Sequence, residues 1–282
     1  MRIAVASGKG GTGKTTFSTN LYYLLRREKR ETTFLDCDVE EPNAHIFLNP
    51  LFSEKKDVSI PVPLINEQRC KRCGDCAKAC EFKALVDIEV EILVFSELCH
   101  GCGLCTFICH SGAIREIDRV IGIVQRGKAY GGDFINGTLK IGEHLSTPLI
   151  REVKSYMPEE GITIIDAPPG TSCTVISSIY NTDFVLLVTE PTPFGLNDLI
   201  LAVETVRKLG INFGVAVNRA DIGDRKLWQY CKDESIEILI EIPHDRRIAE
   251  VYSKGELLLR EIPEYEDVFH KMFLNIEEMS RR

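Results

Sequence analysis

Ser7-Gly8-Lys9-Gly10-Gly11-Thr12-Gly13-Lys14-Thr15-Thr16 is the stretch that decides the fold of this 282-residue chain. The apolar run at residues 3–6 precedes it and predicts a buried strand. Residues 17–28 follow it and predict a helix, because their leucines recur on one face. A strand, a glycine-rich turn and a helix start together form a cradle for phosphate, because successive backbone N–H groups and the helix dipole attract one anion.

The same stretch satisfies the pattern G-x-x-x-x-G-K-T, with Gly8, Gly13, Lys14 and Thr15 at the specified positions. Lys14 is expected to reach the β- and γ-phosphates of ATP, and the Thr15 hydroxyl is expected to ligate Mg²⁺. A chance glycine-rich turn is the alternative, and the order of strand, motif and helix disfavours it. The other loop residues expected to contact the nucleotide are Lys9, Gly10, Gly11, Thr12 and Thr16.

Composition excludes several classes of function. The net charge of −8 argues against a nucleic-acid surface. No apolar run approaches the length of a membrane span, and no signal peptide is recognised before the first predicted strand, so we expect a cytoplasmic protein. Eight of the eleven cysteines lie between Cys70 and Cys109, which indicates metal binding rather than a disulfide framework.

These eight cysteines form an internal repeat with the spacing C-x-x-C-x-x-C-x-x-x-C. The repeat resembles bacterial-type ferredoxins, in which the fourth cysteine of each run ligates the other of two 4Fe–4S clusters. Zinc is the alternative, but a zinc site needs no third and fourth cysteine at these offsets in both runs. The expected ligands are Cys70, Cys73, Cys76 and Cys109 for one cluster, and Cys99, Cys102, Cys105 and Cys80 for the second.

Carboxylates follow two further predicted strands. Asp36 ends the run at 32–36 and Asp38 comes two residues later, whereas Asp166 ends the run at 162–166 and precedes Ala167-Pro168-Pro169-Gly170. Carboxylates at strand ends beside a phosphate loop suit Mg²⁺, often through water. A solvated acidic loop is the alternative for the first pair.

The loop sequence Lys-Gly-Gly-Thr-Gly-Lys-Thr-Thr resembles the Mrp/MinD-type ATPases of the CobQ/CobB/MinD/ParA superfamily, a group that includes the nitrogenase iron protein. This resemblance implies a homodimer in which Lys9 acts on the phosphates of the neighbouring subunit. It also implies that Asp36 lies near Mg²⁺ and that Asp38 orients the attacking water. A solvated loop lysine is the alternative for Lys9.

The resemblance extends to the second half of the chain. It implies that Asp166 lies near Mg²⁺, that the Gly170 N–H lies by the γ-phosphate, and that Asn218 contacts adenine. The loop at Pro243 would pack on the base, with a surface turn as the alternative for both adenine contacts. Cys173 is expected to be a small, buried non-ligand near a helix start. A cluster ligand, as at a similar offset in the nitrogenase iron protein, is the alternative that the resemblance implies.

The predicted fold is a doubly wound, mainly parallel α/β domain with an inserted α+β ferredoxin-like domain. We place the ATPase part at 1–59 and 120–282, and the insert at 60–119. Residues 53–57 and 61–63 are interpreted as a linker, and the pairs 131–132 and 136–137 as hairpin turns. A C-terminal helix with Val268, Met272, Phe273 and Ile276 on one face should pack on its own domain.

Three functions remain open. In the first, ATP binding and hydrolysis gate electron transfer through two 4Fe–4S clusters to an unidentified redox partner. In the second, the protein carries iron–sulfur units to other proteins, as Mrp-type relatives do. Those relatives commonly have C-x-x-C near the C-terminal end, and here Cys231 is the only cysteine after Cys173. In the third, the chain is a partner-positioning ATPase whose clusters are structural or redox-sensing.

Overall fold

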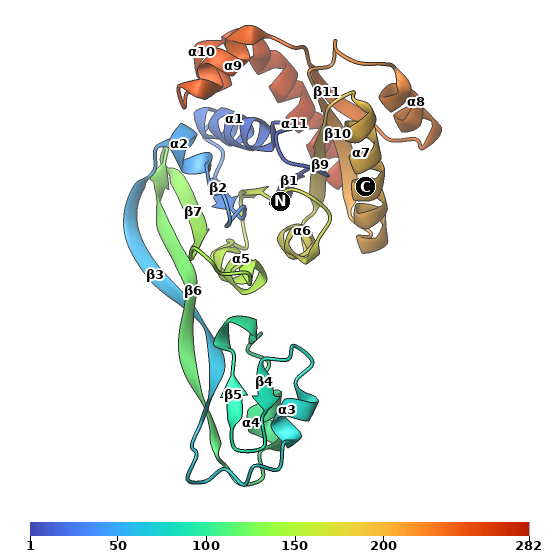
Figure 1. Ribbon diagram of the computed structural model, residues 1–282. Helices are drawn as coiled ribbons and strands as arrows, with labels where there is room; N and C mark the ends of the chain where they lie inside the picture. Colours follow the sequence, from blue (N-terminus) through green and yellow to red (C-terminus); the bar gives the residue numbers. More distant parts are fainter. Residues whose placement is uncertain (282) are drawn as a thin grey trace.

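A nine-stranded sheet with helices on both faces, and a small lobe at the end of a long ribbon, make up the computed structural model, which describes residues 1–281 (Figure 1). In spatial order the strands are β11 (Ile238–Ile242), β10 (Asn212–Asn218), β9 (Phe184–Thr189), β1 (Arg2–Ala6), β8 (Ile162–Asp166), β2 (Thr32–Asp36), β7 (Gly132–Leu139), β6 (Ile114–Ala129) and β3 (Leu51–Ile65). Neighbours from β11 to β7 run parallel, and β6 and β3 are antiparallel. The predicted mainly parallel α/β fold is confirmed.

Two layers of helices cover the sheet because its central strands are apolar on both faces. One layer comprises α1 (Lys14–Arg27), α2 (Ala44–Leu48), α9 (Arg246–Ser253), α10 (Leu258–Glu261), η2 (Pro263–Tyr265) and α11 (Glu266–Ser280). The other comprises α5 (Ser146–Ser155), α6 (Cys173–Ile179), α7 (Pro193–Leu209) and α8 (Lys226–Asp233). The loops at the carboxyl ends of the parallel strands emerge between these layers.

The C-terminal helix α11 packs on its own domain, as predicted. Phe269, Met272, Phe273 and Ile276 are fully buried, and the Phe269 ring stacks on Phe17 of α1 with centroids 5.5 Å apart. Val268 was wrongly placed on this face, since it is 40% exposed. Either Val268 or Phe269 could share a helix face with the other three residues. The observed orientation buries the aromatic ring of Phe269 instead of the smaller valine side chain, which removes more apolar area from water.

The ribbon of β3 and β6 was not predicted. Residues 51–65 pair with β6 along their length, so the linker interpretation of 53–57 and 61–63 is wrong. Their polar composition reflects a ribbon whose outer part faces solvent, and Pro61 and Pro63 are tolerated because β3 is an edge strand.

The interpretation of 136–137 as a hairpin turn is also wrong, because both residues lie inside β7. A Cβ atom on Gly137 would come within 2.7 Å of Val39 and 2.8 Å of Val153, so glycine is needed there for close helix packing. The hairpin between β6 and β7 turns at Tyr130–Gly131, next to the predicted pair 131–132.

The ribbon carries a small lobe at residues 66–113 (Figure 1). Its elements are α3 (Asp75–Ala79), β4 (Leu85–Asp87), β5 (Ile92–Val94), η1 (Ser96–Leu98) and α4 (Leu104–Ile108). The sequence repeat is also a structural repeat, since Gly74 and Gly103 both adopt φ 73° immediately before α3 and α4. The predicted insert at 60–119 spans this lobe and the adjoining ends of the ribbon, and its ferredoxin-like nature stays a prediction.

Candidate nucleotide site and two four-cysteine cavities

A cavity of about 330 Å³ lies at the carboxyl ends of the parallel strands, within the usual size of ligand sites. Predicted residues that line it are Gly10, Gly11, Gly13, Lys14, Thr15, Thr16, Asp38, Asn218 and Pro243. Sequence reasoning missed Ile248, Ala249 and Tyr252 on its wall, all from helix α9. Their only signal was the neighbouring loop at Pro243, because nothing local says that α9 turns toward the phosphate loop.

Close approach of other residues explains two glycines of the phosphate loop. A Cβ atom on Gly8 would lie 2.3 Å from the carbonyl oxygen of Asp198. Gly13 adopts φ +101°, and its Cβ would lie 2.6 Å from Asn218 Nδ2. That Asn218 amide donates a hydrogen bond to the Thr12 carbonyl at 2.9 Å, so Asn218 braces the loop as well as lining the cavity. The contact of Asn218 with adenine stays a prediction.

Two buried carboxylates lie side by side below the loop. Asp36 and Asp166 are register partners on β2 and β8, and both are fully buried. Asp36 accepts the N–H groups of Asp38 at 3.2 Å and Ala44 at 3.1 Å, whereas neither Asp166 oxygen has a hydrogen-bond partner among residues 1–281. Burial raises the pKa of Asp166 to about 6 against the opposing charge of Lys14. Burial and the Asp166 charge raise the pKa of Asp36 well above its usual range.

Asp38 extends from the end of β2 into the cavity. Burial raises its pKa to about 7, while the positive charge of Lys14 acts in the opposite direction. A carboxyl group with a pKa near neutrality is suited to accepting a proton at physiological pH. The position and the pKa therefore agree with the chemistry expected of Asp38, although its role in hydrolysis stays a prediction.

Six predicted residues do not line the cavity wall: Gly8, Asp36 and Asp166, described above, and Lys9, Thr12 and Gly170. Lys9 Nζ lies 3.9 Å from Glu190 Oε2, and its side chain is 34% exposed. Thr12 is buried, and its hydroxyl has no hydrogen-bond partner among residues 1–281. The Gly170 N–H donates to the Ser7 carbonyl at 2.9 Å, so a contact with phosphate would require this bond to open.

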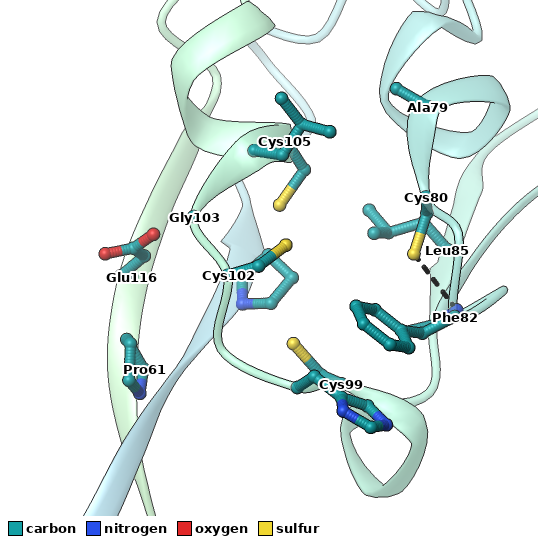
Figure 2. A pocket seen from close by; sticks show the side chains of 14 residues that line it. Pro61, Ala79, Cys80, Phe82, Leu85, Cys99, Cys102, Gly103, Cys105 and Glu116 are labelled. Atoms are coloured by element: carbon teal, nitrogen blue, oxygen red, sulfur yellow. Dashed lines mark hydrogen bonds between the residues drawn. The ribbon is translucent and has the colours of Figure 1, made fainter. Parts of the chain in front are cut away.

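The eight cysteines of the lobe separate into two cavities. Cys70, Cys73, Cys76 and Cys109 line one, and Cys80, Cys99, Cys102 and Cys105 line the second. This grouping is the one expected from the sequence, with the fourth cysteine of each run exchanged between the sets. In Figure 2 the sulfur atoms of the second set turn toward a common space. All eight are free thiols.

The side chains are not arranged for a single metal ion. Within residues 1–281, no group of three or more His, Cys, Asp or Glu side chains could hold one ion. Tetrahedral zinc with Zn–S bonds of about 2.3 Å requires sulfur atoms roughly 4 Å apart. A four-iron cube instead takes one thiolate at each of its four corners, and each cavity is lined by four thiols.

The second cavity lies against the ribbon. Pro61 and Glu116 from β3 and β6 form part of its wall (Figure 2). The Phe82 and His100 rings, which also line it, stack with centroids 3.7 Å apart. Burial raises the pKa of the Cys99 thiol, while the backbone N–H of Gly101 and the Arg119 guanidinium act in the opposite direction.

The remaining cysteines lie outside these cavities. Cys37 and Cys231 are buried, and Cys37 is therefore the small buried residue that was expected between the two aspartates. Cys173 is the first residue of α6, which confirms the predicted helix start. Its expected burial is wrong, because the side chain is exposed at the end of the loop that follows β8.

No helix in residues 1–281 has the length and apolar character needed to cross a membrane.

Comparison with known proteins places these features in a family. The profile described as the CobQ/CobB/MinD/ParA nucleotide binding domain matches residues 3–259. An uncharacterized protein of Methanocaldococcus jannaschii is 35% identical over 264 residues, 92% of each chain. An iron-sulfur cluster carrier protein of Rickettsia bellii is 24% identical over 275 residues, 93% of this chain and 69% of that protein.

Solved structures agree on the fold. The cell division ATPase MinD of Pyrococcus furiosus has a TM-score of 0.58 at 19% identity, covering 98% of both chains. The septum site-determining protein MinD of Pyrococcus horikoshii, complexed with Mg-ADP, has a TM-score of 0.57 at 19% identity, covering 96% of this chain and 93% of that one. With its phosphate loop at the edge of a parallel sheet, this chain belongs to the CobQ/CobB/MinD/ParA family of nucleotide-binding proteins.

Proposed function

We propose that this protein is a dimeric ATPase that couples its nucleotide state to electron transfer through two 4Fe–4S clusters. The observation that carries the proposal is the separation of eight cysteines into two cavities with four thiols each. The distant similarity to an iron-sulfur cluster carrier protein also supports iron–sulfur chemistry. The clusters would supply one-electron donor and acceptor sites, and the chain supplies their thiolates, N–H···S bonds and partial shielding from water.

The nucleotide cavity fits ATP with Mg²⁺. Lys14 and the backbone N–H groups of the loop would bind phosphate, and the Thr15 hydroxyl would ligate the metal. Within residues 1–281 neither Asp166 oxygen has a hydrogen-bond partner, and a cation with its bound water would satisfy them. Asp36 adds a second carboxylate beside them. Asp38 would orient a water molecule and accept its proton, which its pKa of about 7 permits.

The proposed dimer rests on the role that the family resemblance implies for Lys9. In the described monomer its ammonium pairs weakly with Glu190, on the rim of the phosphate loop. A partner subunit that presents its phosphates across a two-fold axis would draw Lys9 away from Glu190, because a polyphosphate carries more charge than one carboxylate. The two phosphate loops would then face one another.

Metal analysis tests the clusters. Anaerobically purified protein is expected to contain about eight iron atoms per chain, as two cubes of four. Cys73→Ser and Cys99→Ser should each remove about four of them, because they alter different cavities. Cys173→Ser is the matched control and should retain all the iron, since its thiol lies outside both cavities. A colourless, zinc-loaded wild type would refute the proposal.

Redox titration tests the coupling. Cluster potentials are measured without nucleotide, with ADP, and with a non-hydrolysable ATP analogue plus Mg²⁺. A tenfold difference in ATP affinity between reduced and oxidised protein would appear as a shift of about 59 mV for one electron. Equal cluster potentials in the three states would show that the nucleotide state is not coupled to the clusters, and would refute gated electron transfer.

A second candidate is iron–sulfur carriage, favoured by the similarity to the carrier protein of Rickettsia bellii. Cys231, the only cysteine after Cys173, is buried, so the described conformation offers no C-terminal thiol for release. Incubation of iron-loaded protein with an apo-ferredoxin acceptor decides between the two. ATP-dependent movement of iron to the acceptor would favour carriage, and retention of iron through many rounds of hydrolysis would favour electron transfer.

A further inference from the structure

Direct contacts lead from the segment after Asp38 to the start of α5. Glu40 Oε1 accepts a hydrogen bond from the Ser146 hydroxyl at 3.0 Å. The Val39 carbonyl accepts the Leu139 N–H at 2.8 Å. Movement of the Asp38 segment would therefore displace the first residue of α5 and the end of β7, or break these hydrogen bonds.

Glu143 connects the start of α5 to the ribbon. Its Oε1 accepts the N–H groups of His144 at 2.9 Å and Leu145 at 3.0 Å, immediately before α5. Its Oε2 pairs with Arg119 Nη1 on β6. The Glu143 side chain is only 4% exposed, so solvent screens this ion pair poorly.

The Arg119 guanidinium has donor atoms that its pair with Glu143 does not use. Its Nε and Nη2 atoms are buried and bond to no acceptor within residues 1–281, although its side chain is only 18% exposed. Burying a donor without an acceptor costs free energy, and the cost is larger for a charged group. The two unpaired guanidinium nitrogens of Arg119 therefore point to a further, anionic partner.

The position of Arg119 on the ribbon agrees with this. It pairs across the ribbon with Ile60 of β3, and a Cβ atom on Gly101 would lie 3.4 Å from the Ile60 Cβ. Gly101 belongs to the loop between Cys99 and Cys102, so that loop packs on the ribbon where Arg119 lies.

We propose that Arg119 is a positioning residue that places a positive charge beside the cluster held by Cys80, Cys99, Cys102 and Cys105, and that Glu143 sets this charge according to nucleotide state. The inference rests on the proposed function, because it requires the cluster. A four-thiolate cluster becomes more negative on reduction, so a nearby cation stabilises the reduced form and raises the potential. The other cluster, held in the cavity of Cys70 and Cys109, should be much less affected.

Three ribbon variants test the charge. Arg119→Gln should lower one of the two cluster potentials by about 59 mV, equivalent to a tenfold change in the reduction equilibrium. Arg119→Lys keeps the charge and should recover most of the difference. Arg126→Gln is the matched control and should change neither potential, since Arg126 is on the same strand but pairs with Asp133 near the sheet.

Glu143→Gln tests the connection to the nucleotide. The variant keeps an acceptor for the two N–H groups but weakens the hold on Arg119. The potential difference between the nucleotide-free and ATP-analogue states should shrink at least twofold, and the ratio of ATP affinities of the reduced and oxidised protein should shrink with it. A full nucleotide response in Glu143→Gln would overturn the proposed role of Glu143.

Iron content of the same samples separates the possible failures. A wild type without about eight iron atoms would overturn the proposed function and this inference with it. Full iron in Arg119→Gln with both potentials equal to those of the wild type would overturn the inference alone. Loss of iron in Arg119→Gln but not in Arg119→Lys would support the positive charge, and equal loss in both would reduce Arg119 to a packing role.

Discussion

Asp38→Asn should stabilise the nucleotide-free protein at neutral and alkaline pH. Asp38 lies in the cavity, where burial raises its pKa to about 7 from the usual 3.8. The folded protein therefore holds this proton more tightly than the unfolded chain does. Asparagine has nearly the shape of the protonated carboxyl and never ionises.

The sign and size follow from linkage. As the pH rises from about 4 to about 7, the unfolded chain has already released the proton, so the free energy of unfolding falls through this window and then stays level. A shift of about three pKa units corresponds to roughly 4 kcal/mol at about 1.36 kcal/mol per unit. Asp38 is partly exposed, and solvent screening reduces the expected cost to about 2 kcal/mol. The variant should thus exceed the wild type by about 2 kcal/mol near pH 8 and match it near pH 4.

Urea unfolding followed by tryptophan fluorescence measures this difference under anaerobic conditions. Trp228 is the only tryptophan, and it packs against the core from α8, so it reports on the nucleotide-binding part of the chain. Glu41→Gln is the control, because Glu41 also lines the cavity but is exposed, and its effect should stay within about 0.5 kcal/mol.

A difference between Asp38→Asn and wild type that is constant from pH 4 to pH 8 would refute the linkage argument. The same variant should hydrolyse ATP more slowly and still bind it, because an amide cannot accept the proton of the attacking water. Unchanged hydrolysis would remove Asp38 from the reaction even if the stability curve behaved as expected.

Three further predictions concern the loop and the core. Lys9→Ala should reduce ATP hydrolysis and ATP-dependent dimerisation with little loss of nucleotide binding, whereas Lys14→Ala should weaken hydrolysis and nucleotide binding alike. Nucleotide titration measures binding and sedimentation measures dimerisation, and equal hydrolysis by Lys9→Ala and wild type would exclude a trans role. Gly8→Ala should weaken ATP binding at least tenfold in calorimetry, because its Cβ would collide with backbone of α7 at 2.3 Å. Phe269→Ala should cost about 3–5 kcal/mol in urea unfolding, and its exposed neighbour Val268→Ala less than about 0.5 kcal/mol; similar losses would mean that α11 does not anchor the core.

Local spacing is what made the phosphate loop and the cysteine grouping predictable. Residues 7–16 lie within one strand–turn–helix unit, whose geometry follows from glycine positions and a single helix start. The two cysteine runs likewise bring three thiols together within each loop. The exchange of Cys80 and Cys109 between the cavities was implied by the resemblance of the repeat to bacterial-type ferredoxins. Such short-range constraints leave few alternative arrangements.

Short-range spacing could not predict a strand of polar residues or a contact between residues far apart in the sequence. Residues 51–65 resemble a loop because half of their strand faces water, and only pairing with residues 114–128 makes them a strand. Whether Val268 or Phe269 faces inward depends on the surface that α11 meets, since both fit a helical period.

The sequence by itself determined which binding groups this chain contains: a phosphate cradle, carboxylates at strand ends and two sets of four thiols. Tertiary structure alone decided how these parts are connected. Asn218 braces Thr12 from 206 residues away, Lys9 pairs weakly with Glu190, and Arg119 on β6 pairs with Glu143 just before α5. Motifs are encoded by short-range spacing, whereas these contacts depend on which strands lie side by side, and the order of strands in a sheet is set by the burial of the whole core.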